Sequence, residues 1–353
     1  MIAAVKRAVR RVLPSDAGER YARTQQVLRR WYFDDGYRFT RLIYSRGAKS
    51  YRREKSAFHA GARKYYRESA NAQQRFELRR HVHMIEKGLC MQPRRATFAA
   101  AYIEATVAAY VNLAPTLDTE EREWVGSVLA DYVDATSASD DVRVQRAASI
   151  AMASGLLAAQ DFRDSAPYEV GQPISQVAQI DLHDLANIRT SVRWFTADKV
   201  PREVIDTAVS TALQAPTACN RIPWQIRIFD EPGAAREVAA LAMGTAGYLQ
   251  SIANVAVFVG DQSAYFDERD RHLIYIDASL AAMSFVLSLQ AANVSSCCIN
   301  WPDIPRREAK MAQLLGLEKY ERVVMLVAFG FPDPAGLTPF SGKKSIDSAR
   351  SYG

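Results

Sequence analysis

The stretch that decides the fold reads Asn187-Ile188-Arg189-Thr190-Ser191-Val192-Arg193-Trp194-Phe195. Two arginines and two hydroxyl residues lie within five positions of it. Guanidinium groups donate hydrogen bonds along a planar edge, so this density of donors suits a phosphate or a carbonyl-rich ring. Taken alone, the stretch fits a solvated helix end equally well. Its meaning therefore depends on the residues that follow it at fixed distances.

Length and composition indicate a globular protein. The 353 residues suffice for two domains, or for one domain with a large extension, and 48% of them are hydrophobic. No run of 18 apolar residues predicts a transmembrane span, and residues 1–13 lack the features of a secretory signal. The four cysteines show no metal-ligand spacing, which favours reduced thiols and a cytoplasmic protein.

Charge is distributed unevenly along the chain. Residues 1–95 contain 24 Lys and Arg against 8 Asp and Glu, whereas the remainder contains 21 against 31. The basic part fits an anionic membrane surface, which would place the protein peripherally at the inner membrane face, or an acidic partner. It fits equally well an acidic face of the same chain. Aromatic residues interleave with Arg and Lys over 31–66, but no nucleic-acid-binding motif accompanies them, which disfavours nucleic acid.

The N-terminal half is predicted to be helical. Residues 97–113, 119–136 and 142–162 show apolar periodicity, and Asp118 with Glu121 resembles a capping box. Another helix is expected to end at Gly88. His81 and His83 lie on it two residues apart, so they point away from each other and cannot share a metal ion. We therefore predict no metal site, and we predict a linker over 164–180.

The C-terminal half mixes strands and helices, which indicates an α+β or α/β domain. Strands are predicted over 225–229, 254–260, 295–300 and 322–330, and helices over 201–214, 273–293 and 306–315. The helix over 273–293 is apolar nearly all round and is predicted to be buried, by an oligomer interface among other possibilities. Motifs of dinucleotide-binding Rossmann folds, phosphate-binding loops and serine hydrolases are all missing from the sequence.

Four blocks, in order, resemble the nitroreductase family of flavin-dependent oxidoreductases. The first is the opening stretch, and the second is Ala215-Pro216-Thr217-Ala218-Cys219-Asn220-Arg221-Ile222-Pro223-Trp224. The third ends in Ser295-Ser296-Cys297-Cys298-Ile299-Asn300, and the last is Phe329-Gly330-Phe331-Pro332 followed by Lys343-Lys344. The resemblance implies an α+β fold with a mostly antiparallel sheet flanked by helices over 181–353. The basic, mainly helical residues 1–163 would precede this FMN-binding domain.

The resemblance also implies a homodimer with FMN in the cleft between subunits. Arg189, Thr190 and Ser191 would bind the phosphate and ribityl side, with Lys343 or Lys344 adding charge there. Arg193 would face the pyrimidine edge of the ring, where a cation stabilises the reduced flavin. Asn220, beside Pro216 and Thr217, would hydrogen-bond the ring, and a backbone N–H near Cys298, Ile299 or Asn300 would meet flavin N5. Ile222 and Asn300 depart from the residues common in the family.

Two further features have alternative interpretations. Cys297 and Cys298 are interpreted as a buried structural pair in preference to a redox-active one. His83-Met84-Ile85-Glu86-Lys87-Gly88-Leu89 resembles an H-x-x-E-K-G-L element of an N-terminally extended branch of the family linked with polysaccharide biosynthesis. His83, Glu86 and Lys87 would serve as an active-site cover or as an intramolecular dock.

The sequence thus predicts an FMN-dependent oxidoreductase. Hydride from NADH or NADPH would reduce an unidentified electron-poor, small-molecule acceptor in a ping-pong cycle without a catalytic side-chain acid or base. A third hypothesis, also an enzyme, is a specialised redox step such as dehalogenation, flavin cleavage or peptide dehydrogenation. The alternative is a flavin-fold binding or scaffold protein that docks through its basic segment to a membrane-associated biosynthetic assembly.

Overall fold

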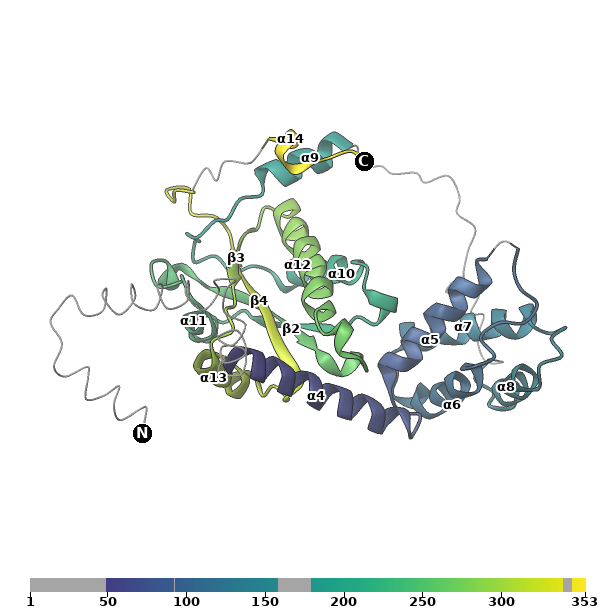
Figure 1. Cartoon of the computed structure of the whole chain (residues 1–353). Coiled ribbons are helices and arrows are strands. Elements are labelled where there is room, and N and C mark those ends of the chain that lie inside the picture. Colours follow the sequence, from purple (N-terminus) through teal and green to yellow (C-terminus); the bar gives the residue numbers. More distant parts are fainter. Residues whose placement is uncertain (1–48, 92, 158–178, 339–344) are drawn as a thin grey trace, which may run out of the picture. The chain divides into compact units, whose positions relative to one another are not determined.

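The computed structural model describes residues 49–91, 93–157, 179–338 and 345–353 (Figure 1). The chain divides into two compact units, Met1–Lys55 and Ser56–Gly353. Only residues 49–55 of the first unit are described, so the fold below is that of the second unit. The predicted linker over 164–180 and the pair Lys343 and Lys344 fall largely or wholly outside the described residues.

A group of helices forms the N-terminal part of the second unit. These helices are α4 (Lys49–Ser69), α5 (Arg75–Leu89), α6 (Ile103–Leu113), α7 (Thr119–Ala135) and α8 (Val142–Ala153). The side chain of Asp118 caps α7 by accepting a hydrogen bond from the Glu121 N–H at 2.8 Å. This is half of the predicted capping box, because the Glu121 carboxylate pairs with Arg75 and Arg79 instead.

The helical group has its own hydrophobic core. Each of α5, α6, α7 and α8 contributes one apolar stripe to it, and Leu78, Val82, Ile85, Ile103, Val107, Val125, Val128 and Leu129 are buried there. Gly88 lies inside the last turn of α5 and does not cap it, contrary to prediction. A Cβ at this position would lie 2.5 Å from the Phe98 ring, so close packing explains the glycine. Residues 97–102, predicted to be helical, are irregular and deliver Phe98 to this contact.

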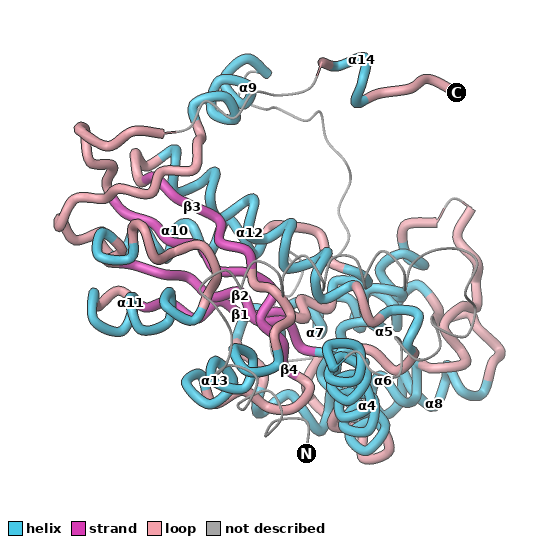
Figure 2. The backbone as a smooth tube through the Cα atoms, turned by 60° about the vertical axis from the view of Figure 1, so that its left-hand side comes forward, coloured by secondary structure: helices cyan, strands magenta, loops and turns pink. Residues whose placement is uncertain are grey.

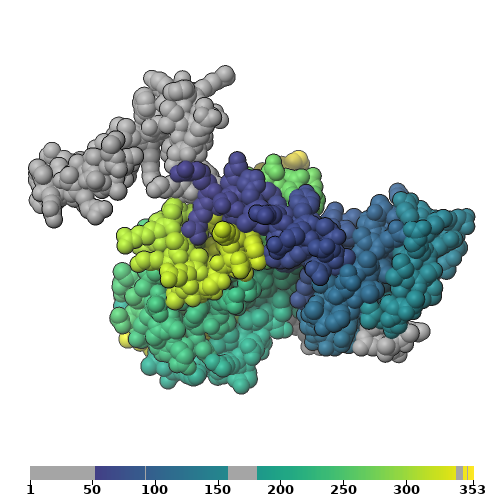
Figure 3. Space-filling model, turned by 90° about the horizontal axis from the view of Figure 1, so that it is seen from below, coloured from purple at the N-terminus to yellow at the C-terminus, as the bar shows by residue number. Residues whose placement is uncertain are grey.

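Helix α4 crosses the turn that follows strand β2 (Asn254–Asp261), and Gly61 permits the crossing. A Cβ on Gly61 would lie 2.6 Å from the backbone of Gln262. One turn later, the Lys64 ammonium lies 5.5 Å from the centre of the Tyr320 ring. In the space-filling view, purple atoms of α4 adjoin the yellow-green segment that includes strand β4 (Glu321–Gly330) (Figure 3).

Gly61→Ala is expected to lower the free energy of unfolding by about 1–3 kcal/mol, because the added methyl group overpacks this contact. Helix propensity alone predicts the opposite sign, since Ala is the better helix former. Gly233→Ala in helix α11 (Pro232–Leu241) is the matched control, because a Cβ there meets nothing within 4 Å. Urea denaturation of both variants measures the difference, and equal stability of the two would contradict the packing argument.

A four-stranded antiparallel sheet with the order β1-β2-β4-β3 forms the centre of the C-terminal part (Figure 2). The other strands are β1 (Trp224–Phe229) and β3 (Ser295–Asn300). The remaining helices are α9 (Gln179–Ile188), α10 (Arg202–Leu213), α12 (Leu273–Ala291), α13 (Pro305–Leu315) and α14 (Ile346–Ala349). The antiparallel α+β architecture predicted from the sequence is confirmed, while α9 and α11 were not foreseen as helices.

Helices α10 and α12 lie on one face of the sheet and α11 and α13 on the other (Figure 1). A hydrophobic core fills the space on each face. Alternating residues of β2 serve both faces, because successive side chains of a strand point in opposite directions. Phe258 packs with α10 and α12, whereas Val257 and Val259 pack with α11 and α13. Helix α12 with the turn before it, Glu268–Ala291, is long and apolar enough to cross a membrane by length and composition alone. Its buried face packs on the sheet, however, so this is weak support for a membrane span.

Candidate functional site

The arginine-rich stretch follows the end of α9 and runs along the edge of β3. The Val192 N–H donates to the Ser296 carbonyl at 3.1 Å, and Ser191 forms an isolated parallel bridge with Ser296. Phe195 anchors the end of the stretch in the core beneath the sheet. Asn187 and Ile188 are the last two residues of α9, and the backbone from Arg189 to Phe195 is not helical. The stretch therefore begins at a helix end and continues along the edge of the sheet.

Arg189 and Arg193 have no carboxylate partner among the residues that the structure describes. Arg193 is half-buried, donates to the Ser191 carbonyl at 3.3 Å and lies 5.9 Å from the centre of the Tyr248 ring. Its own carbonyl accepts a 2.6 Å hydrogen bond from the Ser251 hydroxyl, which fixes the backbone. Two guanidinium groups that lack a carboxylate partner within the described part of the chain, beside the hydroxyls of Thr190 and Ser191, form a donor set suited to an anion.

Strand β3 places Cys298 and Asn300 outward and Cys297 and Ile299 inward. Cys297 is buried beside the Tyr248 hydroxyl, so the interpretation of both cysteines as a buried pair is wrong for Cys298. The reason is the two-residue period of a strand. Surrounding protein and Cys297 raise the pKa of the Cys298 thiol, whereas the positive charge of Arg189 lowers it. The bridge between Ser191 and Ser296 brings the backbone near Arg189 and Cys298 together. The Ile299 side chain points inward, so this residue can offer only its backbone groups on the outward side of β3.

The second candidate segment, residues 215–224, is a loop with an unusual backbone. Cys219, Asn220 and Ile222 have φ values of 55°, 50° and 50°, in the left-handed region that few non-glycine residues adopt. Thr217 holds the loop from within, because its hydroxyl accepts from the Ile222 N–H at 3.0 Å and its carbonyl accepts from the Asn220 N–H at 3.0 Å. Pro216 is exposed at the start of the loop. Strained backbone of this kind is concentrated at functional sites.

Helix α12 anchors this loop through Asp277. The Asp277 carboxylate accepts a 3.0 Å hydrogen bond from the Ala218 N–H and a 3.3 Å hydrogen bond from the Tyr265 hydroxyl. Burial raises the pKa of Asp277, although these two hydrogen bonds and Arg221 act in the opposite direction. The Arg221 guanidinium in turn lies 5.1 Å from the centre of the Tyr265 ring. The loop therefore has a fixed attachment to the domain core.

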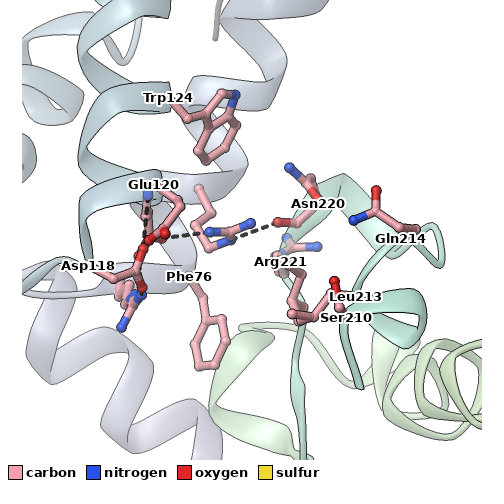
Figure 4. Close-up of a pocket in the computed structure, with 13 residues that line it drawn as sticks. Phe76, Asp118, Glu120, Trp124, Ser210, Leu213, Gln214, Asn220 and Arg221 are labelled. Atoms are coloured by element: carbon pink, nitrogen blue, oxygen red, sulfur yellow. Dashed lines mark hydrogen bonds and ion pairs between the residues drawn. The ribbon is translucent and has the colours of Figure 1, made fainter. Parts of the chain in front are cut away.

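Helices α5 and α7 face the same loop from the other side across a pocket of about 1010 Å³. Figure 4 shows Trp124 and Asp118 on the helical side and Asn220 and Gln214 on the opposite side. The pocket is lined by Arg75, Phe76, Arg79, Asp118, Glu120, Glu121, Trp124, Ser210, Leu213, Gln214, Asn220, Arg221 and Ile222. Its volume lies at the upper end of the usual range for small-molecule sites. None of the pocket residues on α5 and α7 was predicted from the sequence as a site residue.

The H-x-x-E-K-G-L element, residues 83–89 of α5, contacts the pocket residue Trp124. Glu86 accepts a 2.7 Å hydrogen bond from the Trp124 indole, and its other oxygen lies 3.0 Å from Nδ1 of His83. Lys87 is exposed. His83 and Glu86 thus hold Trp124, which lines the pocket. The roles of this element as an active-site cover or as an intramolecular dock both stay predictions.

His81 is buried on the other side of α5, where its ring lies 4.9 Å from that of Tyr102. Burial, with the charges of Arg80 and Arg221, lowers its pKa from 6.5 to about 4 against the opposing effect of Glu77. Within the described residues, no cluster of His, Cys, Asp and Glu could hold a metal ion.

The His81 pKa predicts a loss of stability at acid pH. Because the folded-state value of about 4 lies below 6.5, the unfolded chain binds more protons within this window, and stability falls as the pH falls through it. The loss amounts to about 3 kcal/mol below pH 4. Asp261, whose pKa burial raises to about 6, acts in the opposite direction. In urea denaturation, the free energy of unfolding should therefore fall less between pH 7 and pH 4 in His81→Gln than in the wild type. An equal fall in the two proteins would contradict this prediction.

One chain does not bring all candidate residues together. The Asn220 loop is tied to Asp277 near the start of α12, whereas Ser191 is tied to Ser296, just after the end of that helix. The helix rises 1.5 Å per residue, so these two sets lie on the order of 20 Å apart along its axis. Between them, Ile276, Leu280 and Met283 form an exposed apolar row, here called the α12 stripe, and they are 48%, 44% and 46% exposed. Their spacing places them on one face of the helix.

Comparison with known proteins identifies relatives of the C-terminal part. The model of the nitroreductase family matches residues 187–256 and 242–331. Iodotyrosine deiodinase 1 of Pongo abelii is 22% identical over 195 residues, which span 47% of this chain and 66% of the deiodinase. An NADH dehydrogenase of Thermus thermophilus is 24% identical over 187 residues, or 44% of this chain and 89% of that protein.

Two solved structures are also similar to part of the chain. A nitroreductase family protein from Streptococcus pneumoniae is 23% identical with a TM-score of 0.42, covering 48% of this chain and 99% of that one. An FMN-dependent nitroreductase from Clostridium difficile is 18% identical with a TM-score of 0.39, covering 44% of this chain and 91% of that one.

Proposed function

We propose that this chain, in which residues 187–331 form a domain of the nitroreductase family, is an FMN-dependent oxidoreductase. The observation that carries the proposal is the donor set beside β3, where Arg189 and Arg193 lack carboxylate partners among the described residues. Half-buried guanidinium groups are costly to leave without a counter-ion, so the site fits a bound anion such as the flavin phosphate.

The donor chemistry of the site fits FMN. Arg189, Thr190 and Ser191 would bind the phosphate and ribityl groups, and Arg193 would place its charge at the pyrimidine edge. The outward side of β3 at Cys298 and Asn300, with backbone groups of Ile299, would face the ring. Lys343 and Lys344 remain predicted phosphate contacts. Bound FMN would supply the hydride-transfer chemistry, and the protein residues would contribute position and charge.

The two separated sets of residues support a homodimer. In a two-fold pair whose axis passes perpendicular to α12 at Leu280, the start of α12 in one subunit would lie beside the end of α12 in the other. Contact through the α12 stripe would therefore bring Asn220, with Pro216 and Thr217, to the donor set of the partner subunit. This arrangement would bury Ile276, Leu280 and Met283, which are otherwise exposed.

The proposed reaction takes hydride from NADH or NADPH and delivers it to an electron-poor small-molecule acceptor in a ping-pong cycle. The NADH dehydrogenase among the relatives supports a nicotinamide donor. A cytoplasmic location and the alternative of a membrane-docked scaffold stay predictions. The latter depends on the basic residues of 1–95, and residues 1–48 of this range lie outside the described part of the chain.

An absorbance spectrum of the purified full-length protein tests the proposal. We expect flavin bands in the purified protein, or after reconstitution with FMN, and bleaching of these bands under anaerobic NADH or NADPH. A protein that binds no FMN would refute the proposed function. Bleaching by neither nicotinamide would favour the scaffold alternative.

A further inference from the structure

Arg79 of α5 reaches out of the helical region to the backbone of the Asn220 loop. Its Nε donates to the Asn220 carbonyl at 2.8 Å, and one terminal nitrogen donates to Glu121 at 2.7 Å. These two bonds use one planar guanidinium group in two directions. The contact links residues 141 positions apart in the sequence.

The surroundings of Arg79 hold it in this position. Its guanidinium lies 5.0 Å from the centre of the Trp124 ring, and its side chain is 13% exposed. The Trp124 indole is tied in turn to Glu86, which is paired with His83. Glu121 is 2% exposed and is paired on its other side with Arg75. A buried, doubly paired carboxylate and an aromatic face leave the guanidinium little freedom.

The partner of this guanidinium is the strained residue of the loop. Asn220 has a φ of 50°, and the loop around it is otherwise held by Thr217 and, through Ala218, by Asp277. A charged donor on the Asn220 carbonyl favours the conformation in which that carbonyl points toward α5. The direction of the carbonyl also sets the orientation of the Asn220 residue, whose side chain lines the pocket.

We propose that Arg79 is a positioning residue through which the helical extension fixes the flavin-contacting loop at Asn220. His83, Glu86 and Trp124 support it from behind, which gives the H-x-x-E-K-G-L element a role in the site without contact with flavin or acceptor. The inference rests on the proposed function only for its effect on flavin. The restraint on the loop is independent of any ligand.

Arg79→Ala, compared with Arg75→Ala, tests this inference in the full-length protein. Arg75 lies one turn earlier on α5, lines the same pocket and is paired with the same carboxylate, but its described contacts are with Asp118 and Glu121. Either variant leaves Glu121 one arginine. We expect Arg79→Ala alone to speed hydrogen exchange of the amides of residues 217–222 in the apoprotein. In Arg79→Ala, FMN binding measured by fluorescence quenching should weaken roughly 10-fold, and the visible absorbance bands of the bound flavin should shift.

Arg79→Lys separates position from charge. A lysine ammonium keeps the charge, but it cannot bind Glu121 and Asn220 together as the planar guanidinium group does. We therefore expect Arg79→Lys to keep the fast hydrogen exchange of the loop amides and the shifted flavin bands. This variant also carries the comparison if Arg79→Ala does not fold. Equal loop exchange in the Arg79 and Arg75 variants, or full restoration by lysine, would overturn the inference. Failure of the wild type to bind FMN would refute the proposed function, while the exchange comparison would still decide the role of Arg79.

Discussion

Leu280→Asp is expected to convert the protein to monomers that do not retain FMN. Leu280 lies at the centre of the α12 stripe, and a carboxylate there would face its symmetry mate across the two-fold axis without a partner. Because the donor set and the Asn220 loop lie at opposite ends of α12, a separated subunit retains only half of the proposed flavin site. We expect FMN affinity to fall by at least roughly 100-fold, the equivalent of about 2.7 kcal/mol.

Light scattering and flavin titration of the same sample measure both parts of this result. Leu314→Asp is the matched control, since Leu314 is also an exposed leucine, 38% exposed, but lies on α13 across the sheet. The control should remain dimeric and yellow. A dimeric Leu280→Asp variant would show that the α12 stripe is not the interface, and a monomer that binds FMN normally would show that one subunit holds the whole site.

Phe285→Ala is expected to lower the free energy of unfolding by about 3–5 kcal/mol. The ring is fully buried on α12 and meets the rings of Phe258 and Phe329 edge to face, with centroid distances of 5.8 Å and 5.9 Å. The substitution removes both aromatic contacts and leaves a cavity between the helix and the two central strands, β2 and β4.

Urea denaturation followed by tryptophan fluorescence measures this loss. Phe285→Leu provides the control, because it keeps most of the apolar volume and removes only the aromatic geometry, so the expected loss is less than about 1.5 kcal/mol. A similar loss in the two variants would mean that ring geometry, and not cavity volume, dominates at this position. Little loss in either would show that the core can collapse around the missing ring.

The strands and helices of the C-terminal domain were predictable because their patterns are local. The apolar run of β2 and the alternating sequence of β1 each specify a strand within a few residues. The glycine at position 88 was misassigned for a nonlocal reason: the Phe98 ring that requires it comes from another segment. Helix α11 was missed because its apolar face is built mostly of alanines, such as Ala235 and Ala239, which carry a weak periodic signal.

The candidate site likewise contains some residues that the sequence could predict and others that it could not. Arg189, Ser191 and Asn220 were recognisable by the order of the sequence blocks, and their roles toward FMN stay predictions. The contact of Arg79 with Asn220 had no signal in the sequence, since it depends on how α5 packs against a loop 141 residues away. Asp277 was hidden for another reason. It is a lone carboxylate in an apolar helix, and its partners, the Ala218 N–H and the Tyr265 hydroxyl, are found only in the structure.

The placement of the two residue sets at opposite ends of α12 has a consequence for mass action. If each flavin needs both subunits, subunit association and cofactor binding are thermodynamically linked, so each shifts the equilibrium of the other. Specific activity should then decline on dilution as subunits separate, and added FMN should move that decline to lower protein concentration. The concentration of the protein in a cell would thereby help to set the fraction that is dimeric and holds FMN.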